Sequence, residues 1–572
     1  MKKSSFLVRF AAGITAAAIF CAPLGAVVYA EDEVQAEVYA ETGYDYTTDP
    51  NYIAFVQYLK ESNAAEREGE LIYKVELTPS KYGVSPVINV DKYGNIVENG
   101  DDYFSTLPKA ANDTYPSKYD ARDYGYITSV KAQGEAGSCW AFSFAACSEA
   151  SMIKEGIAKG DIDLSEAHMV WFVNRAGCGT DENDTVKGDG RQTDSPYTMG
   201  ATPENAGYAA FAGRGVEKES YAPFYNAKAN FDKMSFDDDE QRYITEYRLK
   251  NMYFYNANSV SDVKKGIMEH GALTLSYYSD DAQFNESKAA YYSTEKNSSA
   301  HAVTLVGWDD DFPKENFVTT PPNDGAWLVK NSWNNTWGDN GYFWMSYDTL
   351  KSDDRCVGVE YYDNKDVYDN IRQYTGAAAA SGYYGSNGLS LSWANIFTSP
   401  NDETLKGVIS YFVADATYSI SVYKEPSAAN PVSGTLLAKK LYIPERTGVY
   451  TLDMDELQFE KGDRYSVVIT VDTSNNTGDI FYIFESKTEG STYPGVSFFK
   501  YSNYSWQSQD NSGGNVYVKA VTVNGETADN ELLAQYKEKL EPIYNTYKDI
   551  SFKGISNTEN YENNNQHGFM AA

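Results

Sequence analysis

The amino-acid sequence predicts an α+β part followed by an all-β sandwich. Before residue 275, apolar residues recur with helical spacing in four segments, and short apolar strands follow them. Beyond residue 363 the helical spacing disappears and short strands alternate with turn residues, which is typical of a sandwich. A chain of 572 residues is also too long for a single hydrophobic core, so several domains are expected.

The α+β part is expected to cover residues 114–362. Its four predicted helices lie near residues 139–156, 164–175, 203–213 and 260–270. Its four predicted strands lie at residues 272–278, 301–308, 326–333 and 341–347. The sandwich is expected to cover residues 363–525, with strands at 405–413, 418–425, 448–454, 464–472, 480–486 and 515–523.

Both ends of the chain carry segments outside these two parts. Three basic residues precede a long apolar run, so residues 1–30 are predicted to be an export signal rather than a membrane anchor. Residues 31–113 begin with an acidic stretch, have a helical pattern at 51–75, and form an N-terminal segment that we interpret as a removable propeptide. Residues 526–572 are predicted to hold a short amphipathic helix and a polar tail.

The net charge and the hydropathy of the sequence limit where the protein is expected to reside and which partners it is expected to bind. The formal net charge of −33 disfavours nucleic acid and anionic membranes as partners. No segment after the export signal is apolar enough to span a bilayer, so we expect a secreted protein, free or attached loosely to the cell surface. The acidic loop at 179–195 lacks the glycine and terminal glutamate of a calcium loop, and no metal or cofactor is expected.

A cysteine in the stretch "QGEAGSCWAF" is the candidate nucleophile. Small residues lead into Cys139 and a predicted helix leads away from it. A thiol attacks only as the thiolate, and the first turn of a helix favours an anion. The other cysteines after the signal are Cys147, Cys178 and Cys356, so at most one disulfide can form if Cys139 is catalytic.

The thiolate needs a base, and the chain has four histidines. His567 lies in the tail, His168 lies within a predicted helix, and His270 lies at a helix end. His301 opens the apolar strand "HAVTLVGW" after a polar loop, where it can reach a neighbouring helix terminus. His301 is therefore the candidate base.

The segment "KNSWNNTWGDNGYFW" supplies a candidate for the third catalytic group. An asparagine amide, here Asn331, can hold an imidazole in one tautomer, and an indole, here Trp333, can shield that hydrogen bond from water. An isolated Asn-Ser-Trp is more often a turn. Its position behind Cys139 and His301 favours the catalytic interpretation.

These segments, in this order, resemble the papain-like (C1 family) cysteine peptidases. The matching pieces are "QGEAGSCWAF", "LSEAHMV", "GVEKESYAPF", "HAVTLVGW" and "NSWNNTWGDNGY". The resemblance implies a two-lobed domain with a helical lobe and a β-barrel-like lobe. It also implies these roles: nucleophile Cys139, base and acid His301, orienting residue Asn331, oxyanion donor Gln133, and supporting residues Trp140 and Trp333.

Two features depart from that family or extend beyond it. Ala136 stands where the family usually has a cysteine, so the common disulfide cannot form and the usual pairing of Cys178 is in doubt. Asn334 replaces a usual glycine. Residues 363–525 resemble a lectin-like β-sandwich through pieces such as "ANIFTS", "YPGVSFF" and "NVYVKAVTV", although their aromatic residues are equally suited to fill a core.

The sequence therefore predicts a secreted cysteine endopeptidase that hydrolyses protein or peptide substrates through a thioester acyl-enzyme. One alternative is an acyl transferase with the same thiol chemistry, but such families generally use Asp where Asn331 stands. Another is a surface adhesin or glycan-binding protein that carries an inactive papain-like domain. All candidate catalytic residues precede residue 332, so the sandwich is expected to fold independently and to be dispensable for the chemistry.

Overall fold

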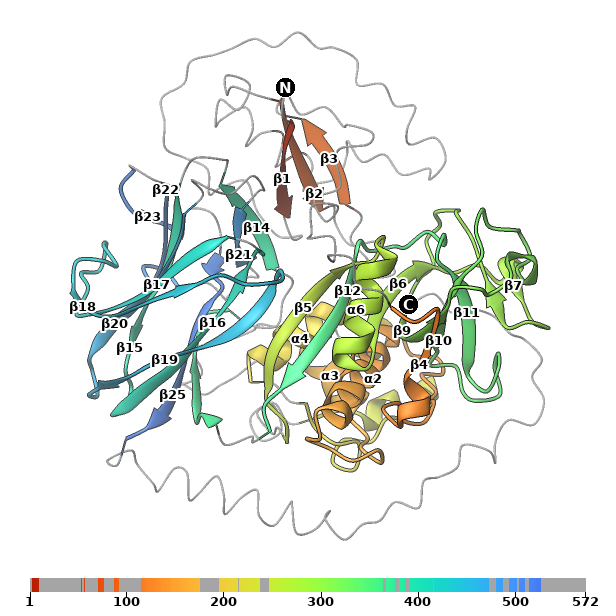
Figure 1. Cartoon of the computed structure of the whole chain (residues 1–572). Helices are drawn as coiled ribbons and strands as arrows, with labels where there is room; N and C mark the ends of the chain where they lie inside the picture. The colour runs from red at the N-terminus through yellow and green to blue at the C-terminus, as the bar shows by residue number, and fades with distance from the viewer. Residues whose placement is uncertain are drawn as a thin grey trace.

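The structure is a computed structural model of the whole chain (Figure 1). It describes the backbone of the strands at 3–9, 70–76, 87–91, 380–385 and 480–486. It describes Ile53 and Val56. It also describes backbone and side chains for residues 115–174, 195–213, 216–236, 246–363, 367–375, 390–414, 416–471, 493–501, 504–509 and 515–525. Cys178 lies outside the described residues, and so do the predicted helix and tail at 526–572. Of the loop at 179–195, only the last residue, Ser195, is described.

A small sheet precedes the two predicted parts. It contains β1 (Lys3–Arg9), β2 (Glu70–Glu76) and β3 (Val87–Asp91), and β1 pairs with β2 in parallel. The helix predicted at 51–75 is therefore wrong at its C-terminal end, where aromatic and β-branched residues favour a strand. Two basic residues of the predicted export signal begin and end β1, and export stays a prediction.

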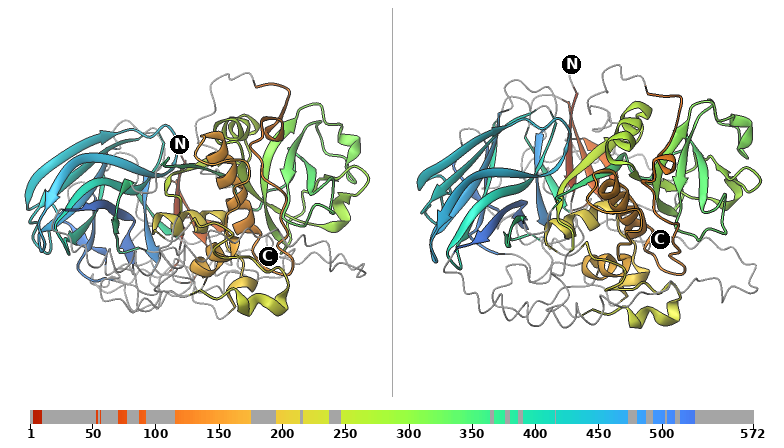
Figure 2. Two further views of the ribbon diagram at one scale, coloured as in Figure 1. Left: turned by 90° about the horizontal axis from the view of Figure 1, so that it is seen from below. Right: turned by 60° about the horizontal axis from the view of Figure 1, so that its bottom comes forward.

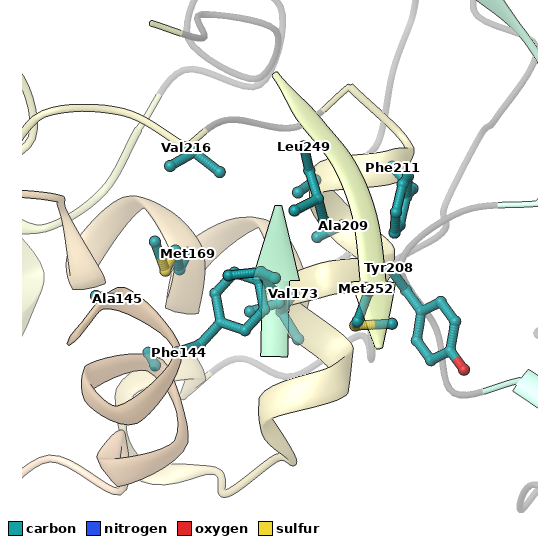
Figure 3. Close-up of a cluster of buried hydrophobic side chains, with 14 of the residues drawn as sticks. Phe144, Ala145, Met169, Val173, Tyr208, Ala209, Phe211, Val216, Leu249 and Met252 are labelled. Carbon is teal, nitrogen blue, oxygen red and sulfur yellow. The ribbon is translucent and has the colours of Figure 1, made fainter. Parts of the chain in front are cut away.

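The first lobe of the α+β part is helical, as predicted. Its helices are α2 (Cys139–Lys154), α3 (Glu166–Asn174) and α4 (Pro203–Phe211). A further helix, α6 (Val260–His270), adjoins the second lobe. Figure 3 shows side chains of α2, α3 and α4 packed together with those of a neighbouring strand. Gly207 permits this close approach, because a Cβ there would lie 2.3 Å from the sulfur of Met252.

The second lobe is a seven-stranded sheet. Its strands are β4 (Lys118–Asp120), β6 (Leu273–Tyr278), β7 (Phe284–Asn285), β8 (Ala290–Tyr291), β9 (Ala300–Asp309), β10 (Ala326–Lys330) and β11 (Tyr342–Ser346). The four predicted strands are confirmed, except that β10 ends at Lys330 and residues 331–333 leave the sheet. Leu305 of β9 pairs with Leu273 and with Val329, so β6 and β10 lie on opposite edges of β9.

The C-terminal part is a β-sandwich, which confirms the predicted fold class. One sheet has the order β18 (Thr435–Tyr442), β17 (Thr417–Lys424), β20 (Arg464–Asp472), β15 (Leu391–Thr398), β22 (Ser497–Tyr501) and β23 (Gln507–Ser508). The facing sheet contains β13 (Asn370–Arg372), β16 (Glu403–Phe412), β19 (Gly448–Phe459) and β25 (Val518–Asn524). A small third sheet contains β14 (Ala380–Gly385), β21 (Ile480–Ser486) and β24 (Gly514–Val516).

One sheet of the sandwich continues into the α+β part. Its order is β12-β5-β19-β16-β25-β13, and β5 (Leu249–Asn256) and β12 (Arg355–Tyr361) come from the first part of the chain. β19 pairs with β5 from Gly448 to Tyr450, and Figures 1 and 2 show β5 and β12 between the helices and the sandwich. A Cβ at Gly448 would lie 2.3 Å from the carbonyl oxygen of Met252. This shared sheet is at odds with a sandwich that folds independently.

Side chains reinforce the junction beside this sheet. Arg446, which precedes β19, pairs with the buried Asp262 at 2.8 Å and lies 3.8 Å from the ring centroid of Tyr255. The hydroxyl of Tyr255 shares a hydrogen bond of 2.7 Å with Nε2 of His270. Gly358 leaves room for this imidazole, since a Cβ there would lie 2.5 Å from it. His270 is thus a structural residue of the junction.

We expect His270→Gln to weaken the loss of stability in acid. Burial lowers the folded-state pKa of His270 from 6.5 to about 3, with Glu360 opposing and Arg446 and Lys154 adding to the shift. The unfolded chain then binds this proton at higher pH than the folded chain, so stability falls as the pH drops from 6.5 toward 3. Melting temperatures of both proteins at pH 7 and pH 4.5 test this. Equal losses in both proteins would contradict the prediction.

Candidate active site

Cys139 is the first residue of α2. Its side chain is 3% exposed, and its sulfur accepts a hydrogen bond from the backbone N–H of Ala302 at 3.5 Å. The first turn of α2 contains no acidic residue, so the helix dipole acts on the sulfur without a competing negative charge. Ala302 follows His301 in β9, and the thiol therefore lies against the strand that carries the predicted base.

His301 is held by the segment that follows β10. Its Nε2 lies 2.8 Å from Oδ1 of Asn331, and that oxygen also accepts the N–H of Ser332 at 2.8 Å. An amide oxygen can only accept, so Nε2 carries the proton of the neutral imidazole and Nδ1 keeps its lone pair. The indole of Trp333 stacks on the imidazole, with centroids 4.5 Å apart and an interplanar angle of 18°.

Gln133 is anchored to the same segment. Its Nε2 donates to the carbonyl oxygen of Ala136 at 2.8 Å, and its Oε1 accepts the hydroxyl of Ser332 at 2.7 Å. Its backbone N–H donates to the carbonyl oxygen of Ser332 at 2.9 Å. The second hydrogen of the Gln133 amide is not used by these contacts. Ser332 was missed in the sequence, although it lies inside the Asn-Ser-Trp motif.

Burial shifts the pKa values of Cys139 and His301 in opposite directions. It raises the pKa of the Cys139 thiol to about 11 and lowers the pKa of His301 to about 4. A negative charge on the sulfur and a positive charge on the imidazole would each favour the other, which opposes both shifts. The start of α2 adds to the stabilisation of the thiolate.

A buried ionic cluster lies directly behind the site. Lys131 forms ion pairs with Glu149 of α2 at 3.0 Å and with Glu166 of α3 at 2.8 Å. Lys330, the residue before Asn331, donates to the hydroxyl of Thr128 at 3.0 Å. Burial lowers the pKa of Lys330 to about 8 and raises that of Glu166 to about 7. The cluster joins both helices to the end of β10, and the sequence analysis did not identify it.

The remaining candidates have structural positions. Trp140 is fully buried in the core of the helical lobe, so its supporting role is packing. His168 packs against Phe172 within α3. Cys147 and Cys356 are buried free thiols, and Cys147 donates to the carbonyl oxygen of Ala272 at 3.3 Å.

Within the described part of the chain, no group of three or more His, Cys, Asp or Glu side chains could hold a metal ion. Among the same residues, no helix is both long enough and apolar enough to cross a membrane.

Two families of known proteins match this chain. The model of the papain family cysteine proteases matches residues 115–360. This part of the chain belongs to the papain family. The lectin-like domain family matches residues 371–522, so both resemblances seen in the sequence are confirmed, as is the enzyme class of cysteine peptidase.

Curated relatives are similar to this chain over two fifths to about half of its length. The Fasciola hepatica cathepsin L-like proteinase is 26% identical over 51% of this chain and 79% of its own length. Rat (Rattus norvegicus) procathepsin L is 29% identical over 41% of this chain and 61% of its own length. Mouse (Mus musculus) cathepsin 7 is 27% identical over 40% of this chain and 61% of its own length. The chain thus spans less than two thirds of the two rodent proteins.

A solved structure shares the arrangement of both parts. It contains the cysteine protease and lectin-like domains of Cwp84, a surface layer associated protein of Clostridium difficile. The TM-score is 0.62 at 24% identity, covering 72% of this chain and 90% of that chain. The likeness establishes a common fold.

We expect Ser332→Ala to lower kcat while leaving KM and the melting temperature near their wild-type values. The substitution removes the hydroxyl that fixes Oε1 of Gln133 and so misdirects the amide. Complete loss of an oxyanion donor costs about 10²–10³ in kcat, and a misdirected donor should cost less than that. Steady-state kinetics on a peptide substrate measure the effect.

Ser143→Ala is the matched control, because Ser143 is a buried serine whose hydroxyl donates to the carbonyl oxygen of Val303 at 2.6 Å. Equal kinetic losses in the two variants would show that Ser332 has only a structural role.

Proposed function

We propose that the chain is an exported cysteine endopeptidase in which Cys139, His301 and Asn331 form the catalytic triad. The observation that carries the proposal is the hydrogen bond of 2.8 Å between His301 and Asn331, beneath the stacked indole of Trp333. It leaves the lone pair of Nδ1 available as a base, and the next residue, Ala302, donates its backbone N–H to the thiol at the N-terminus of α2.

The proposed reaction follows from these positions. Nδ1 of His301 takes the proton of Cys139, and the thiolate attacks the carbonyl carbon of the substrate. Gln133 Nε2 and the backbone N–H of Cys139 donate to the oxyanion. The imidazolium protonates the leaving amine, which leaves a thioester. His301 then deprotonates a water that attacks the thioester, and the acid departs as the thiol is restored.

The remaining parts are assigned as follows. We propose an export signal at 1–30, a propeptide at 31–113, the peptidase at 114–362 and the lectin-like sandwich at 363–525. The fold shared with a surface layer associated protein supports secretion and attachment at a cell surface. The sandwich would make that contact, through glycan or protein, and protein or peptide substrates would enter the peptidase.

Cys139→Ala is expected to abolish hydrolysis of an unfolded protein substrate, since it removes the proposed nucleophile. Asn331→Ala is expected to lower kcat with little change in melting temperature, because it releases the imidazole without opening a large cavity. Cys147→Ala is the control and should keep its activity, since that thiol is buried away from the site. Initial rates and thermal melts measure these outcomes.

Two results would overturn the assignment. Wild-type hydrolysis by Cys139→Ala would exclude the thiol mechanism. A wild-type protein that cleaves no unfolded substrate would favour the inactive-domain alternative, and preferred transfer of the acyl group to an added amine over water would favour the acyl transferase.

Removal of the sandwich is expected to destabilise the peptidase. A chain of residues 31–362 leaves β5 without β19 and exposes the edge of a sheet whose strands lie against the helical core. We expect a lower melting temperature and aggregation relative to residues 31–572, measured by calorimetry and light scattering. A truncated peptidase as soluble, stable and active as the longer protein would show that the shared sheet is not needed.

A further inference from the structure

Tyr277 lies directly across from His301 in the second lobe. β6 and β9 are antiparallel, and their register pairs Tyr277 with His301. Residues opposite each other in an antiparallel pair present their side chains on the same face of the sheet. The two ring centroids lie 5.9 Å apart with an interplanar angle of 64°, which is an edge contact.

The two aromatic neighbours of His301 come from opposite edges of β9. Tyr277 lies on β6, whereas Trp333 follows β10, and β6 and β10 pair with opposite edges of β9. The imidazole is therefore bounded by the stacked indole from one neighbouring strand and by the tyrosine ring from the other.

The tyrosine ring is itself held firmly. It is 2% exposed and packs on Tyr291 at 5.0 Å and on Phe343 at 6.1 Å between centroids. Tyr291 is tied in turn to β6, because its hydroxyl donates to the carbonyl oxygen of Tyr278 at 2.6 Å. An antiparallel backbone bridge joins Tyr277 to Lys351, a residue outside the named strands, and so fixes the end of β6. Tyr277 therefore has little freedom to move away from the imidazole.

We propose that Tyr277 is a positioning residue for the reaction, and that its ring confines the imidazole of His301 and keeps water from its side of the site. This inference rests on the proposed function, in which His301 is the base. The ring fixes the direction of Nδ1 toward the thiol, and it maintains the low-dielectric surroundings of both groups. The phenol stays neutral, since burial and the neighbouring Tyr291 and Cys139 raise its pKa well above 10.

Tyr277→Leu removes the ring and should admit water beside the imidazole. Misplacement of a reacting group by about 1 Å can cost about 10²-fold in rate, so we expect kcat to fall by roughly 10-fold to 10²-fold with little change in KM. Water would also move the pKa of His301 up from about 4 toward its ordinary value. The acid limb of the pH profile for alkylation of Cys139 by iodoacetamide should therefore shift to higher pH. Tyr277→Phe keeps the ring and should retain the wild-type kinetics and profile.

Tyr119→Leu is the matched control. Tyr119 is a buried tyrosine on β4, which pairs with the same strand β9, but it lies opposite Trp308 at the far end of that strand. A structural role alone would make both leucine variants lose melting temperature and kcat together, with unchanged alkylation profiles, and that result would overturn the inference. A wild-type profile and kcat in Tyr277→Leu would overturn it as well.

The same measurements separate this inference from the proposed function. If wild-type protein and Cys139→Ala hydrolyse substrate equally, the proposed function fails whatever Tyr277 does, and the inference falls with it. If Cys139→Ala is inactive while Tyr277→Leu behaves as wild type, the proposed function stands and only the role of Tyr277 is rejected.

Discussion

The pairing of β9 on both of its edges is the constraint on which the site depends. β6 brings Tyr277 to one side of His301, and β10 ends where Asn331 and Trp333 can reach the other side. Ala302, the next residue of β9, donates its N–H to Cys139 and so links the strand to α2. A shift of this register by one residue would turn His301 away from all of these groups.

The segment after β10 holds two of the candidate catalytic side chains. Asn331 accepts from His301, and the adjacent Ser332 holds Gln133 through both its hydroxyl and its carbonyl oxygen. Behind this segment, Lys330 joins Thr128 and the cluster around Glu149, which anchors the start of the segment to α2. One short stretch of backbone therefore positions both His301 and Gln133.

How much the sequence could predict depends on how local each signal is. The helices of the α+β part were predicted correctly from periodicity, and short motifs singled out Cys139, His301 and Asn331, which the structure brings to one place. Strand β5 was missed because "LKNMYFYN" is buried on both faces and so shows no alternation, and because its partner β19 lies about 200 positions later. The contacts of Ser332 and Tyr277 were missed because each joins segments that are separated in the sequence.

The sandwich also supports α2, the helix that begins at Cys139. β19 pairs with β5 and β5 pairs with β12, and the carbonyl oxygens of β12 accept hydrogen bonds from α2. Ser151 donates to Val359 at 2.7 Å and Cys147 donates to Val357 at 3.4 Å. A continuous line of hydrogen bonds thus runs from the sandwich through two strands to the buried face of α2. Because α2 begins at Cys139, the sandwich is part of the framework that positions the thiol, and its contribution to the enzyme is structural whatever its outer surface binds.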